Sequence, residues 1–293
     1  MPDTIGNPLS WSAKEIGAAG RHVGSVAGRV GHGDGGTVEI PGVRHLAVRD
    51  LREVLRKGVE DFAACRSDVA FLALLYPVIG ILLVWMALDR NLLPLMFPVM
   101  SGFALVGPVA AVGLYEMSRR RERGETPGWA DGLAVERSPA FGAILVLGLM
   151  LFAAFIAWIY VAHAIWNQTL GPVPPETLRG FLTETFTTGA GWAMMVIGCG
   201  VGALFAGAVL ATSVVSFPLL LDRDIGIPAA VVTSLRVARA NPVPILAWGL
   251  IVAAGLVLGS IPFFLGLIVV MPVLGHATWH LYRRAVVAGP PRP

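Results

Sequence analysis

The chain has 293 residues, of which 55% are hydrophobic and 14% carry charge, and its mean hydropathy is +0.71. Because a soluble globular domain is about 25% charged, this composition excludes an ordinary soluble domain and indicates a membrane protein. The net charge of +3 does not indicate a nucleic-acid partner, because the basic residues gather at the ends of apolar segments, where they set membrane orientation. We therefore expect the lipid bilayer to surround most of the chain.

The N-terminal part divides into two segments. Residues 1–45 are rich in glycine and show no sustained periodicity, which predicts a disordered cytoplasmic N-terminus. An interfacial region at 46–68 follows, with an amphipathic helix over about 50–66 that Asp50 and Glu53 begin with a capping box. Its apolar positions recur at helical spacing: Leu51, Val54, Leu55, Val59 and Phe62.

A membrane domain at 69–284 contains six apolar segments, each close to the ~20 residues that a spanning helix needs. They are 69–88, 92–116, 141–165, 190–217, 243–260 and 262–282. A single helix over 243–282 would be ~60 Å long, twice the ~30 Å hydrocarbon core, so a break near 259–262 is expected. The predicted fold is all-α: a polytopic membrane protein with six transmembrane helices as three hairpins and interfacial amphipathic helices, the second of these at 227–240.

The distribution of basic residues predicts the orientation. With a cytoplasmic N-terminus and six spans, 20 of the 22 Lys and Arg residues lie inside, and Arg90 and Arg179 lie outside. This is a strong positive-inside pattern. It predicts a multi-pass protein of the bacterial inner membrane with both termini, including a tail at 285–293, in the cytoplasm.

Two further patterns concern helix packing. Residues 97–120 align without gaps to 261–284, with identities at two arginines and two prolines among others, which predicts a parallel repeat relating spans two and six. The alternative is chance similarity between two apolar helices. In the fourth span Gly198, Gly202 and Ala206 stand four residues apart, a spacing that permits close helix contact within the chain or between chains.

Ionisable residues are rare inside the predicted spans, so the few present are candidates for a functional site. His276 and His280 are four residues apart and share one helix face, and Glu116 and Asp222 should lie at the same inner depth. Imidazole and carboxylate groups at one depth could hold a divalent metal or a haem iron, or pass a proton. The alternative is that His276 makes a hydrogen bond within the helix bundle while His280 lies at the membrane interface among aromatic residues.

Several short stretches of the sequence indicate a family resemblance. They are Gly58…Asp61-Phe62, the stretch 216–224, Ser234…Asn241-Pro242 and the stretch 274–280. Together they resemble a family of bacterial predicted integral membrane proteins whose domain has no assigned function, over about 48–284. Some members are labelled as related to cytochrome c oxidase subunit I, and that label implies an accessory association with a respiratory complex.

The sequence contains no GxSxG, P-loop, HExxH or Rossmann signature on a suitable element. We therefore predict a non-enzymatic membrane protein without a cofactor, acting as an accessory, scaffold or assembly partner of a membrane complex or as a homo-oligomer. The runner-up is a carrier for a small or amphipathic solute, which the prolines in the spans and the parallel repeat favour. A metal- or haem-binding protein is the third alternative.

Overall fold

The computed structural model describes residues 40–73, 78, 80–82, 85, 93–173 and 175–287. These residues are mostly helical, and the only extended pairing among them is an isolated antiparallel bridge between Val43 and Val286. The all-α prediction is therefore confirmed over this part of the chain. The helices are α2 (Asp50–Ala73), α4 (Met96–Phe103), α5 (Gly107–Ala110), α6 (Val112–Glu122), α7 (Trp129–Leu133), α8 (Phe141–Gln168), α9 (Leu178–Thr187), α10 (Gly189–Ser213), α11 (Ser216–Asp222), α12 (Gly226–Ala240), α13 (Pro242–Ser260) and α14 (Leu267–Ala285), with short 3-10 helices at Leu93–Leu95, Ala104–Val106 and Ala134–Arg137.

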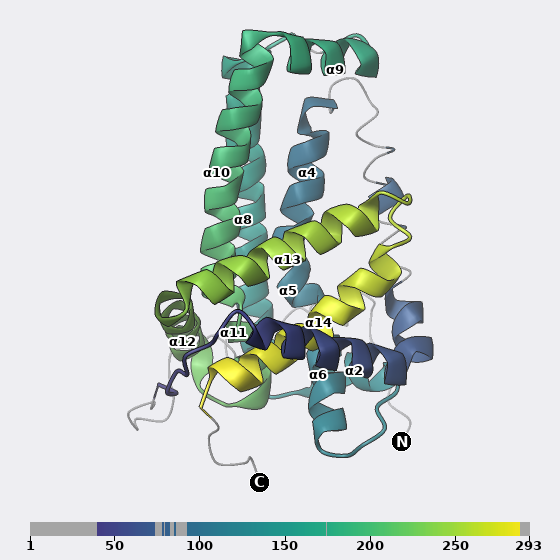
Figure 1. Ribbon diagram of the computed structural model, residues 1–293, viewed down its shortest axis with the longest axis vertical. Helices are drawn as coiled ribbons and strands as arrows, with labels where there is room; N and C mark the ends of the chain where they lie inside the picture. The colour runs from purple at the N-terminus through teal and green to yellow at the C-terminus, as the bar shows by residue number, and fades with distance from the viewer. Residues whose placement is uncertain are drawn as a thin grey trace, which may run out of the picture.

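Within the described residues, four helical stretches are long and apolar enough to cross a membrane. They are Leu93–Glu122, Phe141–Gln168, Gly189–Asp222 and Pro242–Ser260. These stretches agree with the second to fifth predicted spans. Figure 1 shows α8 and α10 running side by side with α4 next to them, while α9 crosses their far end.

The other two predicted spans are not confirmed. The segment 69–88 lies largely outside the described residues. The segment 262–282 is mostly helix α14, but it begins only at Leu267 because residues 261–266 form a turn in which Phe263 and Phe264 have positive φ. The turn shortens the apolar run, and the second half of α14 is polar, so α14 is not among the four candidate spans. The predicted break near 259–262 is present, since α13 ends at Ser260.

Trp158 is the centre of the contact among the long helices. Its ring nitrogen donates a hydrogen bond to the carbonyl oxygen of Pro98 on α4 over 2.9 Å, and its ring lies 5.7 Å from that of Phe205 on α10. Gly102 and Gly202 leave the room that this indole occupies, because a Cβ at either position would stand 3.0 Å or less from it. The small residue at position 202 therefore permits close packing within the chain, which is one of the two predicted alternatives, the other being contact between chains.

The other end of the molecule is a dense helical cluster, which we call the polar end: α2, α6, α7, α11, α12 and the second half of α14 (Figure 1). Helix α2 is longer than the predicted 50–66 and lies along α14. Gly58 makes this approach possible, because a Cβ there would stand 2.7 Å from the backbone oxygen of Val273. The start of α2 differs from the predicted capping box: the Asp50 carboxylate accepts from the Ala47 N–H over 2.9 Å, and Glu53 pairs with Arg56.

The two ends of the described chain meet at the polar end. Val287 donates a backbone hydrogen bond to Gly42, and Arg44 donates one to Ala285. Asn241, at the start of α13, fixes this segment by accepting from the N–H of Leu46 over 2.6 Å. The last residues of the predicted N-terminal segment 1–45 are thus placed beside the first residues of the predicted tail 285–293, whereas residues 1–39 lie outside the described part.

The two segments of the predicted repeat differ in local structure. Residues 97–120 are helical through α4, α5 and α6 with a 3-10 turn between, whereas 261–284 begins with a non-helical turn. The comparison of the hairpins that precede them falls on 69–88, most of which is not described. The repeat therefore stays a prediction.

Candidate functional site

Asp61 on α2 is the centre of a buried hydrogen-bond network at the polar end. One carboxylate oxygen accepts from Ser118 Oγ over 2.6 Å and from His280 Nε2 over 2.8 Å, and the other accepts from Arg121 over 2.6 Å. Burial by itself would raise the pKa of Asp61, but the bonds from His280 and Ser118 outweigh it and hold that pKa below its usual value. Asp61 is therefore a carboxylate that only accepts hydrogen bonds.

This arrangement determines the tautomer of His276. Ser118 Oγ lies 2.8 Å from His276 Nδ1, and the single hydroxyl proton of Ser118 already goes to Asp61. The serine oxygen must therefore accept, so that Nδ1 of His276 carries the proton and donates it. The other ring nitrogen, Nε2, is then an unprotonated acceptor, and it is buried without a hydrogen-bond partner among the described residues.

His276 is held neutral by its surroundings. The residue has no exposed surface, and this burial lowers its pKa to about 4, although the charge of Asp61 acts in the opposite direction. A charged imidazolium at this position would face Arg121 and His280 as well. His276 is thus a neutral base at physiological pH.

The Asp61, Ser118 and His276 side chains do not form a nucleophilic triad, although the three residue types are those of one. In a triad the histidine accepts the serine proton, and the carboxylate orients the histidine. Here the serine donates to the carboxylate and the histidine donates to the serine, so His276 cannot activate Ser118 in this arrangement. The network is suited to fixing α2, α6 and α14 together, one residue from each helix.

The predicted ligand set is divided between different networks. His276 and His280 meet through Asp61, whereas Glu116 accepts from Arg119 and Arg120, and Asp222 accepts from the Tyr282 hydroxyl over 2.6 Å. Within the part of the chain that the structure describes, no three His, Cys, Asp or Glu side chains are arranged to hold a metal ion. The prediction that these four residues converge therefore finds no support in their positions. The alternative for His276, a hydrogen bond within the bundle, agrees with its bond to Ser118.

Two features of this site were missed from the sequence. Asp61 was not among the predicted apolar positions of its helix, yet it is 6% exposed, while Val59, which was one of them, is 49% exposed. The periodicity contained the signal, because Asp61 follows Val54 by seven residues and so shares its face. One predicted alternative placed the aromatic residues beside His280 at the membrane interface, but these residues, Trp279 and Tyr282, are each only 1% exposed and lie inside the polar end.

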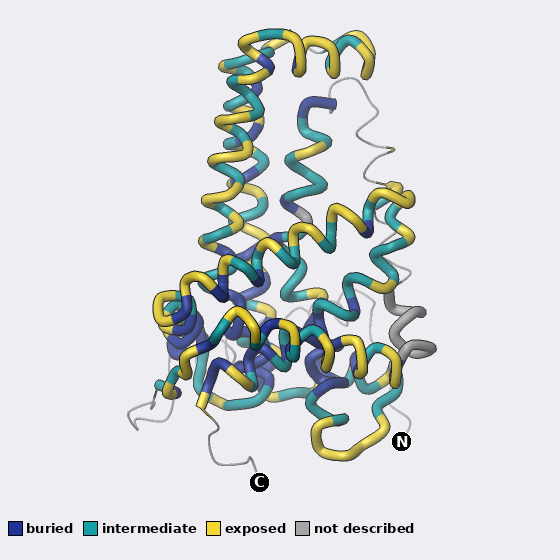
Figure 2. The backbone as a smooth tube through the Cα atoms, in the orientation of Figure 1, coloured by how far each residue is buried: buried dark blue, intermediate teal, exposed yellow. Residues whose placement is uncertain are grey.

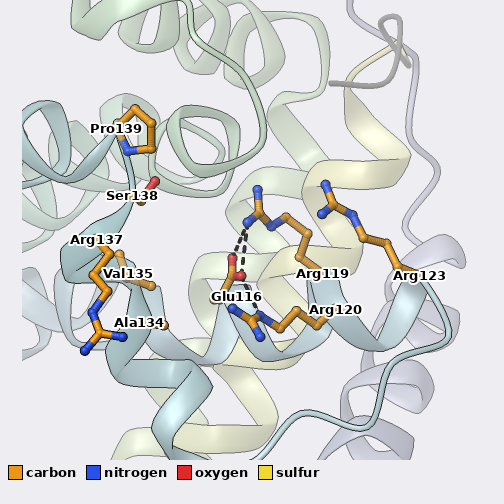
Figure 3. Close-up of a pocket in the computed structure, with 9 residues that line it drawn as sticks. All are labelled: Glu116, Arg119, Arg120, Arg123, Ala134, Val135, Arg137, Ser138 and Pro139. Carbon is orange, nitrogen blue, oxygen red and sulfur yellow. Dashed lines mark hydrogen bonds and ion pairs between the residues drawn. The ribbon is translucent and has the colours of Figure 1, made fainter. Parts of the chain in front are cut away.

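A second candidate site is a cavity of about 520 Å³ next to Glu116, between α6 and the segment that leads to α8. Four arginines line it, together with Glu116 and Ser138: Arg119, Arg120, Arg123 and Arg137. Figure 3 shows the guanidinium groups of Arg119 and Arg120 on either side of the Glu116 carboxylate. The cavity thus brings together four cationic groups and one carboxylate at the junction of two candidate spans.

The four arginines differ in how far they are neutralised. Arg120 binds Glu116 over 2.8 Å and Asp131 over 2.5 Å, and Arg119 lies 2.8 Å from Glu116. In contrast, Arg123 makes no ion pair with any described residue, and the Nε of Arg119 is buried without a hydrogen-bond partner there. Positive charge therefore remains uncompensated on one wall of the cavity.

Long apolar helices joined to a charged helical cluster define an integral membrane protein of the all-α class. Residues 95–222 match a family model described as "Predicted integral membrane protein (DUF2189)", which confirms the predicted family resemblance over that range. The matched range contains the Arg-lined cavity and the predicted residues Glu116 and Asp222, whereas Asp61, His276 and His280 lie outside it. Neither a curated protein nor a solved structure matches the chain.

Proposed function

We propose that this protein is a non-enzymatic accessory or assembly partner of another integral membrane protein, and that α10 is the helix that contacts this partner. One observation carries the proposal: only 6% of the apolar window of Gly189–Asp222 is buried within the chain, against 22–28% for the other three candidate spans. Since apolar helices in lipid associate through close packing rather than through the hydrophobic effect, an unburied helix is available to a partner.

The composition of the exposed face of α10 supports this role. Gly200, Ala203 and Gly207 follow one another at helical spacing, and beside them Val196 is 68% exposed and Leu204 73% exposed. No atom of the described chain lies within 4 Å of a Cβ placed at either of the two glycines. Small residues on an open face allow the backbone of a second helix to come close.

The orientation that we propose places the polar end in the cytoplasm of a bacterium. Arginines gather there from separate segments: Arg119, Arg120, Arg121, Arg123, Arg137, Arg223, Arg236, Arg239, Arg283 and Arg284. This excess follows the positive-inside rule. A single cysteine introduced at the exposed residue Arg239, and a second one at the exposed residue Leu182 on α9, should react with a membrane-impermeant reagent only from the cytoplasmic and only from the outer side, respectively.

The carrier alternative has less support than the accessory role. A carrier binds its substrate near the middle of the membrane, between its spanning helices. The Arg-lined cavity lies at the polar end instead, where the candidate span Leu93–Glu122 ends. We therefore keep the accessory role as the proposed function.

Site-specific photo-crosslinking in native membranes tests the proposal. A photoreactive amino acid replaces Leu204 on the open face of α10, and mass spectrometry identifies the adducts after irradiation. We expect a defined adduct with a different membrane protein. The matched control is the same substitution at Leu250 on α13, which is 71% exposed and so equally open to lipid.

Three outcomes are distinguishable. A protein adduct at position 204 that is absent at position 250 supports the accessory role. Adducts with a second copy of the chain would replace that role with self-association through α10. Lipid adducts alone at both positions would refute the proposal.

A further inference from the structure

We propose that the Arg-lined cavity beside Glu116 is a binding site for a phosphate group, carried by an anionic phospholipid headgroup or by a free phosphate. The cavity is lined by Arg119, Arg120, Arg123 and Arg137 and by the hydroxyl of Ser138. Planar guanidinium groups present paired N–H donors that match phosphate oxygens, and such charge-assisted bonds are stronger than neutral ones. This site is independent of the partner face on α10.

The first argument is that a guanidinium group is already held in place at the cavity. Arg119 binds the carbonyl oxygen of Leu221 over 2.9 Å and lies 2.8 Å from Glu116. A charged group that the fold has already positioned loses little conformational freedom when a ligand binds, so the wall of the cavity is preorganised for an anion.

The second argument is that the charge is not already neutralised. Glu116 is occupied by Arg119 and Arg120, and Asp131 binds Arg120. Arg123 has no ion pair with a described residue, and Arg137 makes one contact of 3.9 Å with Glu136 while its side chain is 84% exposed. An exposed pair of that length contributes little. Two guanidinium groups thus remain available to a ligand.

The third argument is the position of the cavity in the fold. It lies where the candidate span Leu93–Glu122 ends and just before Phe141–Gln168 begins, so in a bilayer it faces the headgroup region. Basic pockets between transmembrane helices at this depth are suited to phosphate-bearing lipid headgroups. The volume of about 520 Å³ is within the ~300–1,000 Å³ of ordinary ligand sites and exceeds what a phosphate ion needs.

Native mass spectrometry of the full-length protein in mild detergent tests the site. One arm adds phosphatidylglycerol, a second adds zwitterionic phosphatidylcholine at the same concentration, and a third adds inorganic phosphate. We expect bound phosphatidylglycerol in the first arm and much less bound lipid in the second. Binding of inorganic phosphate in the third arm would identify the free anion as a sufficient ligand, whereas binding of phosphatidylglycerol only would identify the lipid as the source.

The test variant is the double substitution Arg123→Gln and Arg137→Gln. It removes the two guanidinium groups that the fold does not use, so we expect binding at least about tenfold weaker, since charge-assisted hydrogen bonds are lost. The matched controls are Arg239→Gln, an exposed arginine at the end of α12, and Arg236→Gln, an exposed arginine earlier on the same helix. Both controls should bind phosphatidylglycerol as the unchanged protein does.

A second measurement uses the unchanged protein and so does not depend on the folding of a variant. Phenylglyoxal modifies accessible arginines, and peptide mapping then gives the extent of modification at each position. Bound phosphatidylglycerol or phosphate should protect Arg123 and Arg137 at least about threefold and leave Arg239 unprotected. Equal binding by the double variant and the controls, or equal modification with and without ligand at all three positions, would overturn the proposal.

Discussion

The two ends of the molecule differ in how far their side chains are buried within the chain. At the polar end α2, α6, α11 and α14 bury nearly all of their facing side chains, including the polar residues Asp61, Ser118 and His276. Along α8 and α10 many large apolar side chains are exposed instead. Figure 2 shows, in yellow, how many residues of these upper helices are exposed. The facing side chains of the polar end therefore make their contacts within the chain, whereas the exposed apolar side chains of the long helices are left to contact lipid or a partner.

This difference predicts where the chain is sensitive to substitution. A buried network fixes the relative positions of its helices, because removal of one partner leaves the others buried without hydrogen bonds. An apolar side chain that faces lipid has no such partners within the chain, and a smaller apolar side chain there leaves the fold unchanged. The following predictions compare matched substitutions in the two regions, in order of decreasing effect.

The largest effect is expected from Asp61→Asn. The substitution removes the charge that Arg121, Ser118 and His280 all face, so the free energy of unfolding should fall by about 3 kcal/mol or more. The matched control is Glu53→Gln on the same helix, whose side chain is 41% exposed and pairs only at the surface. That control should leave the free energy of unfolding nearly unchanged, because an exposed ion pair contributes little.

How firmly α2 is held in place is measured by the rate at which a thiol reagent reacts with Cys65 on this helix, which is 4% exposed and so reacts only when α2 opens. The exposed Cys199 is replaced by Ser in all variants so that only position 65 reacts. Faster labelling of Asp61→Asn than of Glu53→Gln is expected. Equal labelling rates would mean that the network does not hold α2 in place.

The second prediction concerns pH. His276 has a pKa of about 4 in the fold, below its ordinary value of 6.5, so the unfolded chain binds the proton more readily between these values. Stability therefore rises with pH across that window and is lost as pH falls from about 6.5 toward 4. Acidification from pH 7 to pH 5 should cost about 2 kcal/mol through this residue.

The check is the unfolding midpoint in mild detergent at a series of pH values. His276→Gln should flatten the loss between pH 7 and pH 5, because the variant has no proton to bind there. His45→Gln, which changes an exposed histidine, should keep the full slope. A variant at position 276 with an unchanged slope would contradict the buried neutral imidazole. Asp61, whose pKa is lowered, adds a further loss only at more acidic pH.

The third prediction compares two glycines in helices. Gly58→Ala places a methyl group 2.7 Å from the backbone oxygen of Val273, so α2 must move away from α14, at a cost of about 1–2 kcal/mol in the free energy of unfolding. Gly200→Ala meets no atom within 4 Å, and alanine favours the helix, so this variant should be neutral or more stable by up to about 1 kcal/mol. Thermal unfolding of the two purified variants measures the difference, and a shift of the same sign in both would contradict it.

The sequence predicted the long helices better than the polar end, for a physical reason. A span is recognised from its own composition, and 92–116, 141–165, 190–217 and 243–260 were all found in this way. The span predicted at 262–282 is not confirmed. The composition of this segment does not reveal that residues 261–266 form a turn or that a partner helix buries the polar half of α14.

The candidate site was predicted in part for a related reason. The helical spacing placed His276 and His280 on one face, and both do reach Asp61, His276 through Ser118 and His280 directly. The partner itself is more than 200 residues away in sequence and belongs to a helix whose docking depends on Gly58. Glu116 and Asp222 were predicted to join the histidines because all four residues lie at a similar depth in the membrane. Similar depth does not determine which way a side chain points around its helix. These two carboxylates bind arginine and tyrosine side chains instead.

The smallest effect on stability is expected from Leu204→Ala on α10. Leu204 is 73% exposed, so the isolated protein should unfold within about 0.5 kcal/mol of its unchanged form. The same substitution at Leu219, which lies on the same candidate span but has no exposed surface, should cost about 2–5 kcal/mol. If α10 is the partner-facing helix, Leu204→Ala should nevertheless lower the recovery of the partner from mild-detergent extracts, because a side chain at a close helix contact contributes to association and not to the fold of the free chain. Unchanged recovery together with unchanged stability would leave lipid as the neighbour of this face and would contradict the accessory role.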